Sequence, residues 1–369
     1  MKPIAINGRF LTQPVTGVQR HARELVLTLD AMLASGELQR PEQPLELLVP
    51  PTVRERPQLQ YIQPRRGGRF SGHLWEQLSL HAGCRGKVLF TPCGGAPLLH
   101  PDHVFVVPDA AVFSTPGAYT RAYRSWYRWH NRRAGRISGL RLITVSEFSR
   151  NELARHLKLD PASIAVIPLG HEHLLNAEPR PEVLQKLQLS PGEYVLAVGS
   201  ANPNKNFKGL LRAFSILRQQ LSEKTKRMRL VIAGSVGDRI FSEAVGQQEN
   251  VVQTGYVTDG ELRALYENAA CFVFPSFYEG FGLPLLEAMA LGCPAVSSNA
   301  ASLPALGEGA ALFFDPHSPE QMANAIAQVL TDPVFRAELS QQGKRRAIQF
   351  CWRETARQTW GILLEASAS

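Results

Sequence analysis

The sequence has no long apolar run. None approaches the roughly 18 residues that a membrane-spanning helix needs, and the strand-like segment at residues 3–7 is expected to begin the protein without a signal-peptide core before it. Only five cysteines occur among 369 residues, and they are scattered without a C-x-x-C pair. The absence of that pair argues against a structural zinc site or a disulfide framework. We therefore expect a cytoplasmic protein in a reducing compartment.

Motifs for nicotinamide and metal binding are missing as well. The sequence contains no G-x-G-x-x-G fingerprint, which argues against a nicotinamide-dependent dehydrogenase. It contains no D-x-D pair, so neither a divalent metal nor another cofactor is expected. Strands that alternate with helices predict instead an α/β protein, and the length suits two domains.

The positive charge is confined to the first half of the chain. Residues 1–172 hold 22 Lys and Arg against 13 Asp and Glu, whereas residues 173–369 hold 18 against 19, so the halves carry net charges of +9 and −1. This asymmetry suits an acidic partner for the first domain only, either an anionic membrane or a phosphorylated acceptor.

Residues 271–299 contain the clearest functional pattern. An apolar run that stops at Pro275 predicts a buried strand. A loop with Gly280 and Gly282 follows, and Pro284 suits the first turn of a helix because its missing N–H costs nothing there. A glycine-rich loop that opens a helix N-terminus is typical of an anion-binding site.

Two carboxylates, Glu279 and Glu287, bracket this loop. An ionised carboxylate only accepts hydrogen bonds and is repelled by phosphate, so sugar hydroxyls are its natural partners. The pattern therefore suggests a sugar–diphosphate ligand, and a glycine-rich turn with solvated glutamates is the alternative. A glycoside hydrolase would use the two glutamates as a pair, but eight helical residues would hold them about 12 Å apart, too far for that reaction.

The run from Glu279 to Ala288 resembles the E-x7-E signature of glycosyltransferase family 4, the retaining enzymes of the GT-B fold. The resemblance implies that Glu279 holds hydroxyls of the donor sugar and that Glu287 holds the nucleotide ribose. It also implies that the backbone of four residues meets the sugar and the diphosphate: Gly280, Phe281, Gly282 and Leu283.

The loop after the strand at residues 194–198 matches a second family segment. Gly199 and Ser200 open it, and the family pattern Arg-Lys-Asn is expected to place two cations on the donor diphosphate. Here Asn204 replaces the arginine, and Lys205 alone keeps the match. We expect Lys205 to stabilise the departing nucleotide diphosphate; an exposed loop lysine is the alternative.

Three more donor-binding residues follow from the resemblance. Tyr256 and Val257 lie in the family segment beside the nucleotide base. Gly17 opens a helix after the first strand, where family members commonly carry a Gly-Gly pair facing the diphosphate. On its own, the Gly17 signal is also that of a plain helix cap.

Asp109 stands where family 4 usually shows a His-Asp pair, and is expected to act in catalysis together with Lys205 and Glu279. Pro108 replaces the histidine that normally meets the C6 oxygen of the donor sugar. Since proline offers no side-chain hydrogen bond, a 6-deoxy sugar such as rhamnose would fit this position better than mannose or glucose. A simple loop cap is the alternative for Asp109.

Residues 119–141 interleave arginines with aromatic residues. A basic aromatic helix suits an anionic membrane surface or an acceptor, and the alternative is a helix that packs its aromatics inward. No motif supports nucleic-acid binding. The residues expected at this surface are Arg121, Arg124, Trp126, Arg128, Trp129 and Arg132.

The predicted architecture is GT-B, with two Rossmann-like, doubly wound parallel-sheet domains facing across a cleft. We expect an acceptor-side domain at 1–172, a nucleotide-sugar-binding domain at 173–349, and a last helix at 350–369 that crosses back to the first domain. The basic segment at 54–73 is expected to be a mobile loop, and Asp259 is expected to cap the helix at 261–269.

The predicted function is retaining, metal-independent glycosyl transfer. A hexose or 6-deoxyhexose of the mannose or rhamnose type would pass from a nucleotide-diphosphate sugar to a glycan or polyprenyl-linked acceptor. The product would be a cell-envelope polysaccharide such as lipopolysaccharide, and the enzyme would act in the cytoplasm or on the inner face of the cytoplasmic membrane. A non-catalytic sugar-nucleotide-binding module remains the alternative, because Pro108 and Asn204 depart from the family pattern.

Overall fold

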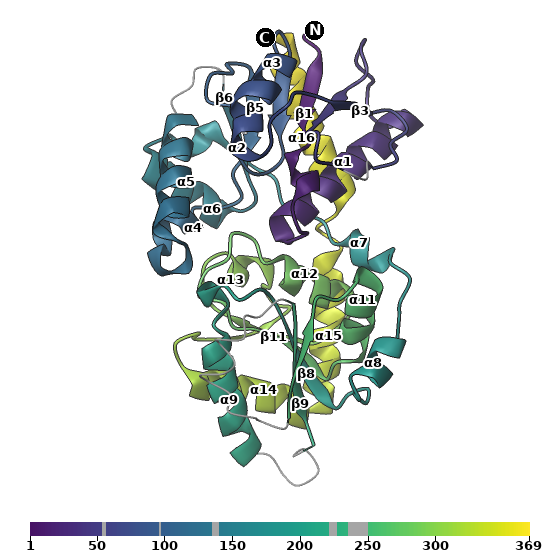
Figure 1. Cartoon of the computed structure of the whole chain (residues 1–369). Coiled ribbons are helices and arrows are strands. Elements are labelled where there is room, and N and C mark those ends of the chain that lie inside the picture. Colours follow the sequence, from purple (N-terminus) through teal and green to yellow (C-terminus); the bar gives the residue numbers. More distant parts are fainter. Residues whose placement is uncertain (54–56, 96, 135–139, 221–226, 235–249) are drawn as a thin grey trace. The chain divides into compact units, whose positions relative to one another are not determined.

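The computed structural model describes the chain except for residues 54–56, 96, 135–139, 221–226 and 235–249 (Figure 1). The chain divides into two compact units. Unit 1 comprises residues 1–170 and 351–369, and unit 2 comprises residues 171–350. Both ends of the chain therefore belong to unit 1.

Unit 1 is built on a parallel sheet whose strands follow the order β3-β2-β1-β4-β5-β6-β7. Most of these strands are continuous apolar runs, as expected for a parallel sheet buried on both faces. Their bounds are β1 Ile4–Asn7, β2 Glu46–Val49, β3 Gln63–Arg66, β4 Val88–Thr91, β5 His103–Val106, β6 Leu140–Thr144 and β7 Ile164–Val166.

The helices of unit 1 include two long ones, α1 and α16, that run side by side (Figure 1). The last helix also bonds to the start of the chain, where the Lys2 backbone N–H donates to the Ser367 carbonyl at 2.8 Å. The bounds are η1 Arg9–Thr12, α1 Gly17–Ser35, α2 Gly72–Leu74, the π-helical η2 Trp75–Leu80, α3 His81–Gly83, α4 Ala111–Ser114, η3 Pro116–Ala118, α5 Arg121–Ala134, α6 Glu147–Leu157, η4 Pro161–Ser163 and α16 Trp352–Ala368.

The expectation of a loop throughout residues 54–73 is wrong for part of that segment. Residues 63–66 form β3, an edge strand that pairs in parallel with β2. The sequence of β3, Gln-Pro-Arg-Arg, has no apolar pattern, because an edge strand that is largely exposed needs none. Proline is tolerated there because an edge strand leaves one row of backbone groups unpaired.

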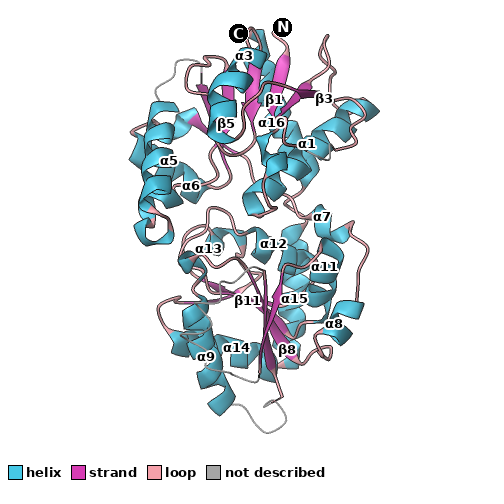
Figure 2. Ribbon diagram, viewed as in Figure 1, coloured by secondary structure: helices cyan, strands magenta, loops and turns pink. Residues whose placement is uncertain are grey.

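Unit 2 contains a second parallel sheet, with the order β10-β9-β8-β11-β12-β13. Figure 2 shows its helices around the strands, and α9 and α14 pack together against one face. The strands are β8 Tyr194–Val198, β9 Arg229–Ala233, β10 Val251–Gly255, β11 Cys271–Phe274, β12 Ala295–Ser298 and β13 Leu312–Phe314. The helices are α7 Glu172–Leu175, α8 Glu182–Lys186, η5 Pro203–Lys205, α9 Phe207–Gln220, α11 Asp259–Asn268, α12 Leu283–Ala290, α13 Leu303–Leu306, α14 Pro319–Thr331 and α15 Pro333–Ala347.

The residue that caps helix α11 is one position earlier in the chain than the sequence prediction placed it. Thr258, and not Asp259, is the N-cap residue. Its hydroxyl accepts from the Glu261 backbone N–H at 3.4 Å, and the Glu261 carboxylate accepts from the Thr258 backbone N–H at 2.8 Å. The motif is a capping box, T-x-x-E, that the sequence already displays.

Both sheets reverse their strand order at one place. In unit 1 the reversal lies between β1 and β4, and in unit 2 it lies between β8 and β11. Ligands of doubly wound sheets bind at the carboxyl ends of the strands at such a switch point. In unit 2 the loops at the switch point are residues 199–206 and 275–282, the segments in which the sequence places most of its donor-binding residues.

Candidate functional site

Lys205 and Glu279 meet at the switch point of unit 2. Lys205 Nζ donates to Glu279 Oε1 at 2.7 Å, and the ammonium lies over the Phe274 ring, 5.2 Å from its centroid. Lys205 comes from the loop after β8 and Glu279 from the loop after β11, so 74 sequence positions separate them. Both side chains keep some exposure, 20% for Lys205 and 14% for Glu279.

Local hydrogen bonds shape the Lys205 loop. The Asn202 side chain accepts from the Asn204 backbone N–H at 2.9 Å and thereby caps η5. The Asn204 carbonyl accepts from the Phe277 backbone N–H at 2.8 Å, which ties the loop after β8 to the loop after β11. Asn206 has φ 52° and donates from Nδ2 to the Pro316 carbonyl at 2.8 Å. The position of Lys205 is therefore fixed from both sides.

Gly199 directly follows β8, and its backbone lies against Gly234, the residue that directly follows β9. A Cβ atom on Gly234, which has φ +117°, would come 2.1 Å from the Gly199 carbonyl oxygen. The backbones at the ends of β8 and β9 are thus in close approach, and only glycine at position 234 permits it. Ser200, the next predicted donor-binding residue, is exposed at the start of the same loop.

The loop before α12 depends on Gly282, its N-cap residue. Gly282 has φ +106°, and a Cβ there would lie 2.5 Å from Leu303 Cδ2. The Ser302 hydroxyl is 2.9 Å from both the Glu279 and the Phe281 carbonyl oxygens and so holds the loop from outside. These contacts set the first turn of α12 at the carboxyl end of β11, where its unpaired N–H groups suit an anion.

The spacing assumed for the two glutamates is wrong. Helix α12 begins at Leu283, so only the second half of the stretch from Glu279 to Glu287 is helical. The argument against a glycoside hydrolase from eight helical residues therefore loses its basis. The two carboxylates are nevertheless separate in their contacts, because Glu279 pairs with Lys205 and Glu287 pairs with other residues.

Glu287 is buried inside unit 2, with 8% of its side chain exposed. His173 Nε2 lies 3.0 Å from Glu287 Oε1, and the Tyr266 hydroxyl lies 3.3 Å from Oε2. Burial raises the pKa of Tyr266 well above its usual value, and the Glu287 carboxylate raises it further. The ribose role of Glu287 stays a prediction, and a ribose hydroxyl would have to share this carboxylate with His173 and Tyr266.

Sequence reasoning missed His173 and Tyr266. Tyr266 lies within the helix that precedes β11, and His173 opens unit 2 in the short α7. A histidine and a tyrosine 93 positions apart, each alone in its segment, give no pattern in the sequence. Only the packing of α7 and α11 beside α12 brings them to one carboxylate.

Tyr256 and Val257 follow β10, at the edge of the unit 2 sheet. Strand β10 is separated from β8 by β9, so these residues are two strands away from the Lys205 loop. Tyr256 is exposed. Their expected place beside a nucleotide base stays a prediction.

The remaining predicted residues of the reaction lie in unit 1. Gly17 is the first residue of α1, and a Cβ there would meet nothing within 4 Å. Asp109 Oδ1 accepts from the Ala111 backbone N–H at 2.8 Å, a local turn at the start of α4. The Pro108 carbonyl accepts from the Thr144 hydroxyl at 3.2 Å. The hydrogen bond to Ala111 is that of a loop cap, and the catalytic role of Asp109 stays a prediction.

A buried charged network at the switch point of unit 1 was not foreseen from the sequence. Glu76 Oε2 lies 2.6 Å from Arg9 Nη1 and 3.0 Å from His73 Nδ1, and Oε1 accepts from the Gly95 backbone N–H at 3.2 Å. Burial acts to lower the pKa of Arg9, but the Glu76 carboxylate and Tyr127 act against it, and the pKa of Arg9 is raised. The only signal in the sequence is one glutamate within the otherwise apolar and neutral run of η2.

Helix α5 packs some of its basic and aromatic side chains within unit 1 and leaves others exposed, and its membrane or acceptor role stays a prediction. Arg128 and Arg132 lie over the Phe113 ring, each 5.5 Å from its centroid, and the Trp126 ring is 5.2 Å from that of His73. These residues pack within unit 1. The aromatic residues of α5 that remain exposed are Tyr123 and Trp129, and Arg121 is exposed as well while Arg124 is partly buried.

Among the described residues, no group of three or more His, Cys, Asp or Glu side chains is arranged to hold a metal ion. None of the helices in the described part of the chain has the length and apolar composition to cross a membrane. All five cysteines are free.

Comparison with known proteins identifies the class of this chain. The family model for glycosyl transferases group 1 matches residues 180–346. The O-antigen chain mannosyltransferase B of Escherichia coli is 36% identical over 260 residues, which cover 68% of this chain and 67% of that protein. The serotype-specific mannosyltransferase WbdA of Escherichia coli is 35% identical over 173 residues, so the chain spans only 21% of that longer relative.

Solved structures show the same fold. Sucrose-phosphate synthase from Thermosynechococcus elongatus superimposes with a TM-score of 0.76 at 21% identity, over all of both chains. WaaG, a glycosyltransferase involved in lipopolysaccharide biosynthesis, superimposes with a TM-score of 0.71 at 16% identity, over 98% of this chain and 99% of that one. The expected GT-B class, with two parallel-sheet α/β units, is confirmed.

The chain belongs to the glycosyl transferases group 1 family. It is a glycosyltransferase, and the resemblance to family 4 that its E-x7-E run suggested is confirmed.

Proposed function

We propose that this glycosyltransferase transfers mannose, or a related 6-deoxyhexose, with retention of configuration from a nucleotide-diphosphate sugar to a growing cell-envelope polysaccharide. The observation that carries the proposal is the Lys205–Glu279 pair at the switch point of unit 2. A cation for a diphosphate and an acceptor for sugar hydroxyls lie there within one hydrogen bond of each other, beside the first turn of α12.

The pair gives a physical account of donor binding. Without donor, Lys205 and Glu279 neutralise each other. An arriving diphosphate offers Lys205 a stronger anionic partner, since phosphate carries more charge and more acceptor oxygens than a carboxylate. Glu279 is then released to accept hydrogen bonds from the sugar. One exchange of partners would thus couple the recognition of the two halves of the donor.

The names of the relatives support mannose as the donor sugar. Escherichia coli O-antigen chain mannosyltransferase B and the MMP alpha-(1->4)-mannosyltransferase of Mycolicibacterium hassiacum, 29% identical over 74% of this chain, both carry that activity in their names. Pro108 supports a 6-deoxy sugar instead, because it offers no partner to a 6-hydroxyl. We therefore propose GDP-mannose as the first donor to test and GDP-rhamnose as its direct competitor, with a glycan or polyprenyl-linked glycan as acceptor.

Turnover tests this proposal. The purified chain is incubated with GDP-mannose or GDP-rhamnose, and with matched UDP- and dTDP-sugars, in the presence and absence of a mannose oligosaccharide. We expect acceptor-dependent release of nucleoside diphosphate from one GDP-sugar, no requirement for added divalent metal, and an α-linked product by NMR if the donor is α-linked. Donor binding without acceptor-dependent release would favour the non-catalytic alternative, and an inverted product would refute retention.

Helix α5 is proposed to hold the enzyme on the anionic inner face of the cytoplasmic membrane. Its exposed Tyr123 and Trp129 would enter the interface and its arginines would meet lipid phosphates. The test is co-sedimentation with vesicles containing phosphatidylglycerol. Binding should fall in high salt and in an Arg121→Gln, Trp129→Ala double variant, and should be unchanged in the control Arg155→Gln on α6. Binding that is insensitive to both would exclude this surface.

A further inference from the structure

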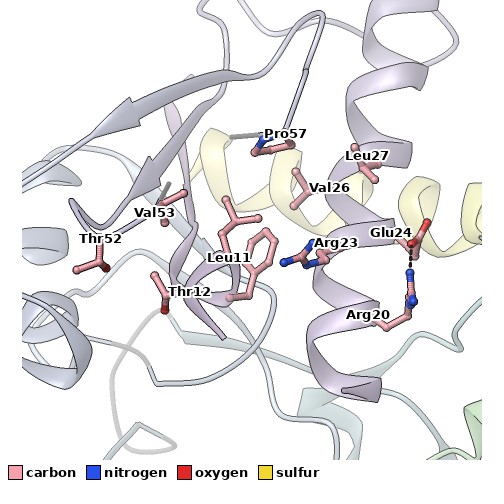
Figure 3. Close-up of a pocket in the computed structure, with 11 residues that line it drawn as sticks. Leu11, Thr12, Arg20, Arg23, Glu24, Val26, Leu27, Thr52, Val53 and Pro57 are labelled. Atoms are coloured by element: carbon pink, nitrogen blue, oxygen red, sulfur yellow. Dashed lines mark hydrogen bonds and ion pairs between the residues drawn. The ribbon is translucent and has the colours of Figure 1, made fainter. Parts of the chain in front are cut away.

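A cavity of about 670 Å³ lies in unit 1, at the carboxyl ends of β1 and β2 (Figure 3). Its walls come from η1, from the first half of α1 and from Thr52, Val53 and Pro57, and none of these lining residues is among the predicted donor-binding residues. A volume of this size is in the range of small-molecule sites. The cavity therefore has room for a ligand that the transfer reaction, as described so far, does not assign.

Much of the lining is apolar. Phe10 and Leu11 come from η1, Val26 and Leu27 from α1, and Val53 and Pro57 from the segment after β2. Leu27 is 42% exposed although it is a large apolar residue. A ligand that covered Leu27 and the facing residues would remove this apolar surface from water, which is favourable.

One cation of the cavity has a buried donor without a partner in the described part of the chain. The Arg23 Nε–H is buried and donates no hydrogen bond to any described residue. In Figure 3 the Arg23 side chain extends from α1 toward Leu11. A guanidinium that is partly withdrawn from water without a counter-charge is unfavourable, and an anion would relieve that cost.

The other described charges of the cavity form no ion pair with Arg23. Arg20 Nη1 pairs with Glu24 Oε1 at 3.3 Å on the same helix, as the dashed line in Figure 3 shows. Among the lining residues that the structure describes, the ionisable ones are Arg20, Arg23 and Glu24, and these three together carry one excess positive charge. A ligand with a single negative charge would balance it. Thr52 adds a hydroxyl that could donate a hydrogen bond to such a group, whereas the Thr12 hydroxyl already donates to the Arg9 carbonyl at 2.8 Å.

We propose that this cavity binds an amphiphilic anion, a phosphate ester or carboxylate attached to an apolar chain. The anionic group pairs with Arg23 in the fork geometry that guanidinium offers to phosphate and carboxylate. The apolar chain lies along Leu11, Val26 and Leu27. The site depends on residues of unit 1 alone, so it does not require the proposed donor or the proposed reaction.

Calorimetric titration of the full chain tests the proposal with defined probes. Octyl phosphate carries both features, methyl phosphate lacks the chain, octyl glucoside lacks the charge, and octanoate replaces phosphate by carboxylate, all below their micelle-forming concentrations. We expect octyl phosphate or octanoate to bind at least about tenfold more tightly than methyl phosphate, because several methylenes are buried. Octyl glucoside should bind at least as weakly as methyl phosphate. Equal affinities for octyl glucoside and octyl phosphate, equal affinities for methyl and octyl phosphate, or no binding of any probe would overturn the proposal.

Variants locate the binding. Arg23→Gln should weaken octyl phosphate binding by about tenfold or more, the value of a charged hydrogen bond, and Arg155→Gln, an exposed arginine of α6, should change nothing. Leu27→Asp places a carboxylate on an already exposed position, so it should preserve the fold and also weaken binding. If Arg23→Gln loses its circular dichroism spectrum, Leu27→Asp decides the question. Wild-type affinity in either folded variant would overturn the proposal.

Discussion

The switch points of the two units have the same strand order but differ in how completely their charges are satisfied. In unit 1, Glu76 is fully buried and contacts Arg9, His73 and the Gly95 backbone. In unit 2, Lys205 and Glu279 are both partly exposed, and among the described residues Glu279 accepts no hydrogen bond other than that from Lys205. One network is saturated by the protein, and the other pair retains acceptor capacity at the carboxyl ends of the strands.

This difference separates a charge network that stabilises a fold from one suited to a ligand. Removing one member of a buried, saturated network leaves the others without partners in a place that water does not reach. Removing one member of the Lys205–Glu279 pair should cost less, because each side chain keeps some exposure and water can reach the partner that is left. Stability should therefore depend on Glu76, whereas turnover should depend on Lys205.

The largest expected effect is on stability, at Glu76. Glu76→Ala should lower the free energy of unfolding by about 3–5 kcal/mol, because Arg9, with only 12% of its side chain exposed, would lose its counter-charge. Urea unfolding followed by circular dichroism measures this change. The control Glu147→Ala removes an exposed partner of Arg150 on α6 and should cost less than about 1 kcal/mol. Similar losses in the two variants would show that burial does not distinguish them.

The second effect is on catalysis, at Lys205. Lys205→Ala should lower kcat by about 10²–10³, since a preorganised cation matters most when charge develops on the leaving diphosphate. Its stability should stay near that of the wild type. Steady-state kinetics with the donor that supports turnover measures the effect, and Lys186→Ala, an exposed lysine of α8, is the matched control. Near-normal turnover of Lys205→Ala would place the neutralising charge elsewhere.

Glu287 lies between the two cases, because it is buried like Glu76 and yet predicted to bind the donor. Glu287→Ala should weaken binding of the nucleoside diphosphate by about 1–3 kcal/mol, the scale of a lost charged hydrogen bond. Calorimetry on the folded variant measures this affinity. The control His173→Phe removes a partner of the carboxylate but leaves the carboxylate itself. Unchanged affinity in Glu287→Ala would make this glutamate, like Glu76, a residue of the fold.

The smallest effect depends on pH and concerns the packing of α16 on α1. His21 stacks on Trp352 with ring centroids 6.1 Å apart, and burial lowers its pKa from 6.5 to about 4. The unfolded chain therefore binds a proton between these values that the folded chain does not, so stability is full above pH 6.5 and falls as the pH drops toward 4. At pH 5 the loss from this residue is about 2 kcal/mol relative to pH 8.

His21→Phe isolates that contribution. The variant keeps a ring against Trp352 but has no titrating group, so its unfolding free energy should fall less between pH 8 and pH 5 than that of the wild type. His100 and His103, whose pKa values burial also lowers, are present in both proteins and cancel in the difference. Parallel pH profiles for the two proteins would rule out a titrating role for His21.

Local features of the fold and the site were determined by the sequence itself. Continuous apolar runs predict the buried strands, because a strand covered on both faces needs no alternation. The residues from Glu279 to Ala288 indicated the family, and Gly282 was placed in the loop where the structure requires a positive φ. The capping box at Thr258 was also present in the sequence, although the prediction chose Asp259.

The tertiary structure decided which distant residues meet and which charges are withdrawn from water. It joined Lys205 to Glu279, added His173 and Tyr266 to Glu287, and enclosed Glu76 with Arg9. None of these pairings has a sequence period, because each joins loops or helices that only the order of the strands brings to the same edge of a sheet. Strand β3 was missed for the same reason, since its place comes from pairing with β2 and not from burial of its own side chains.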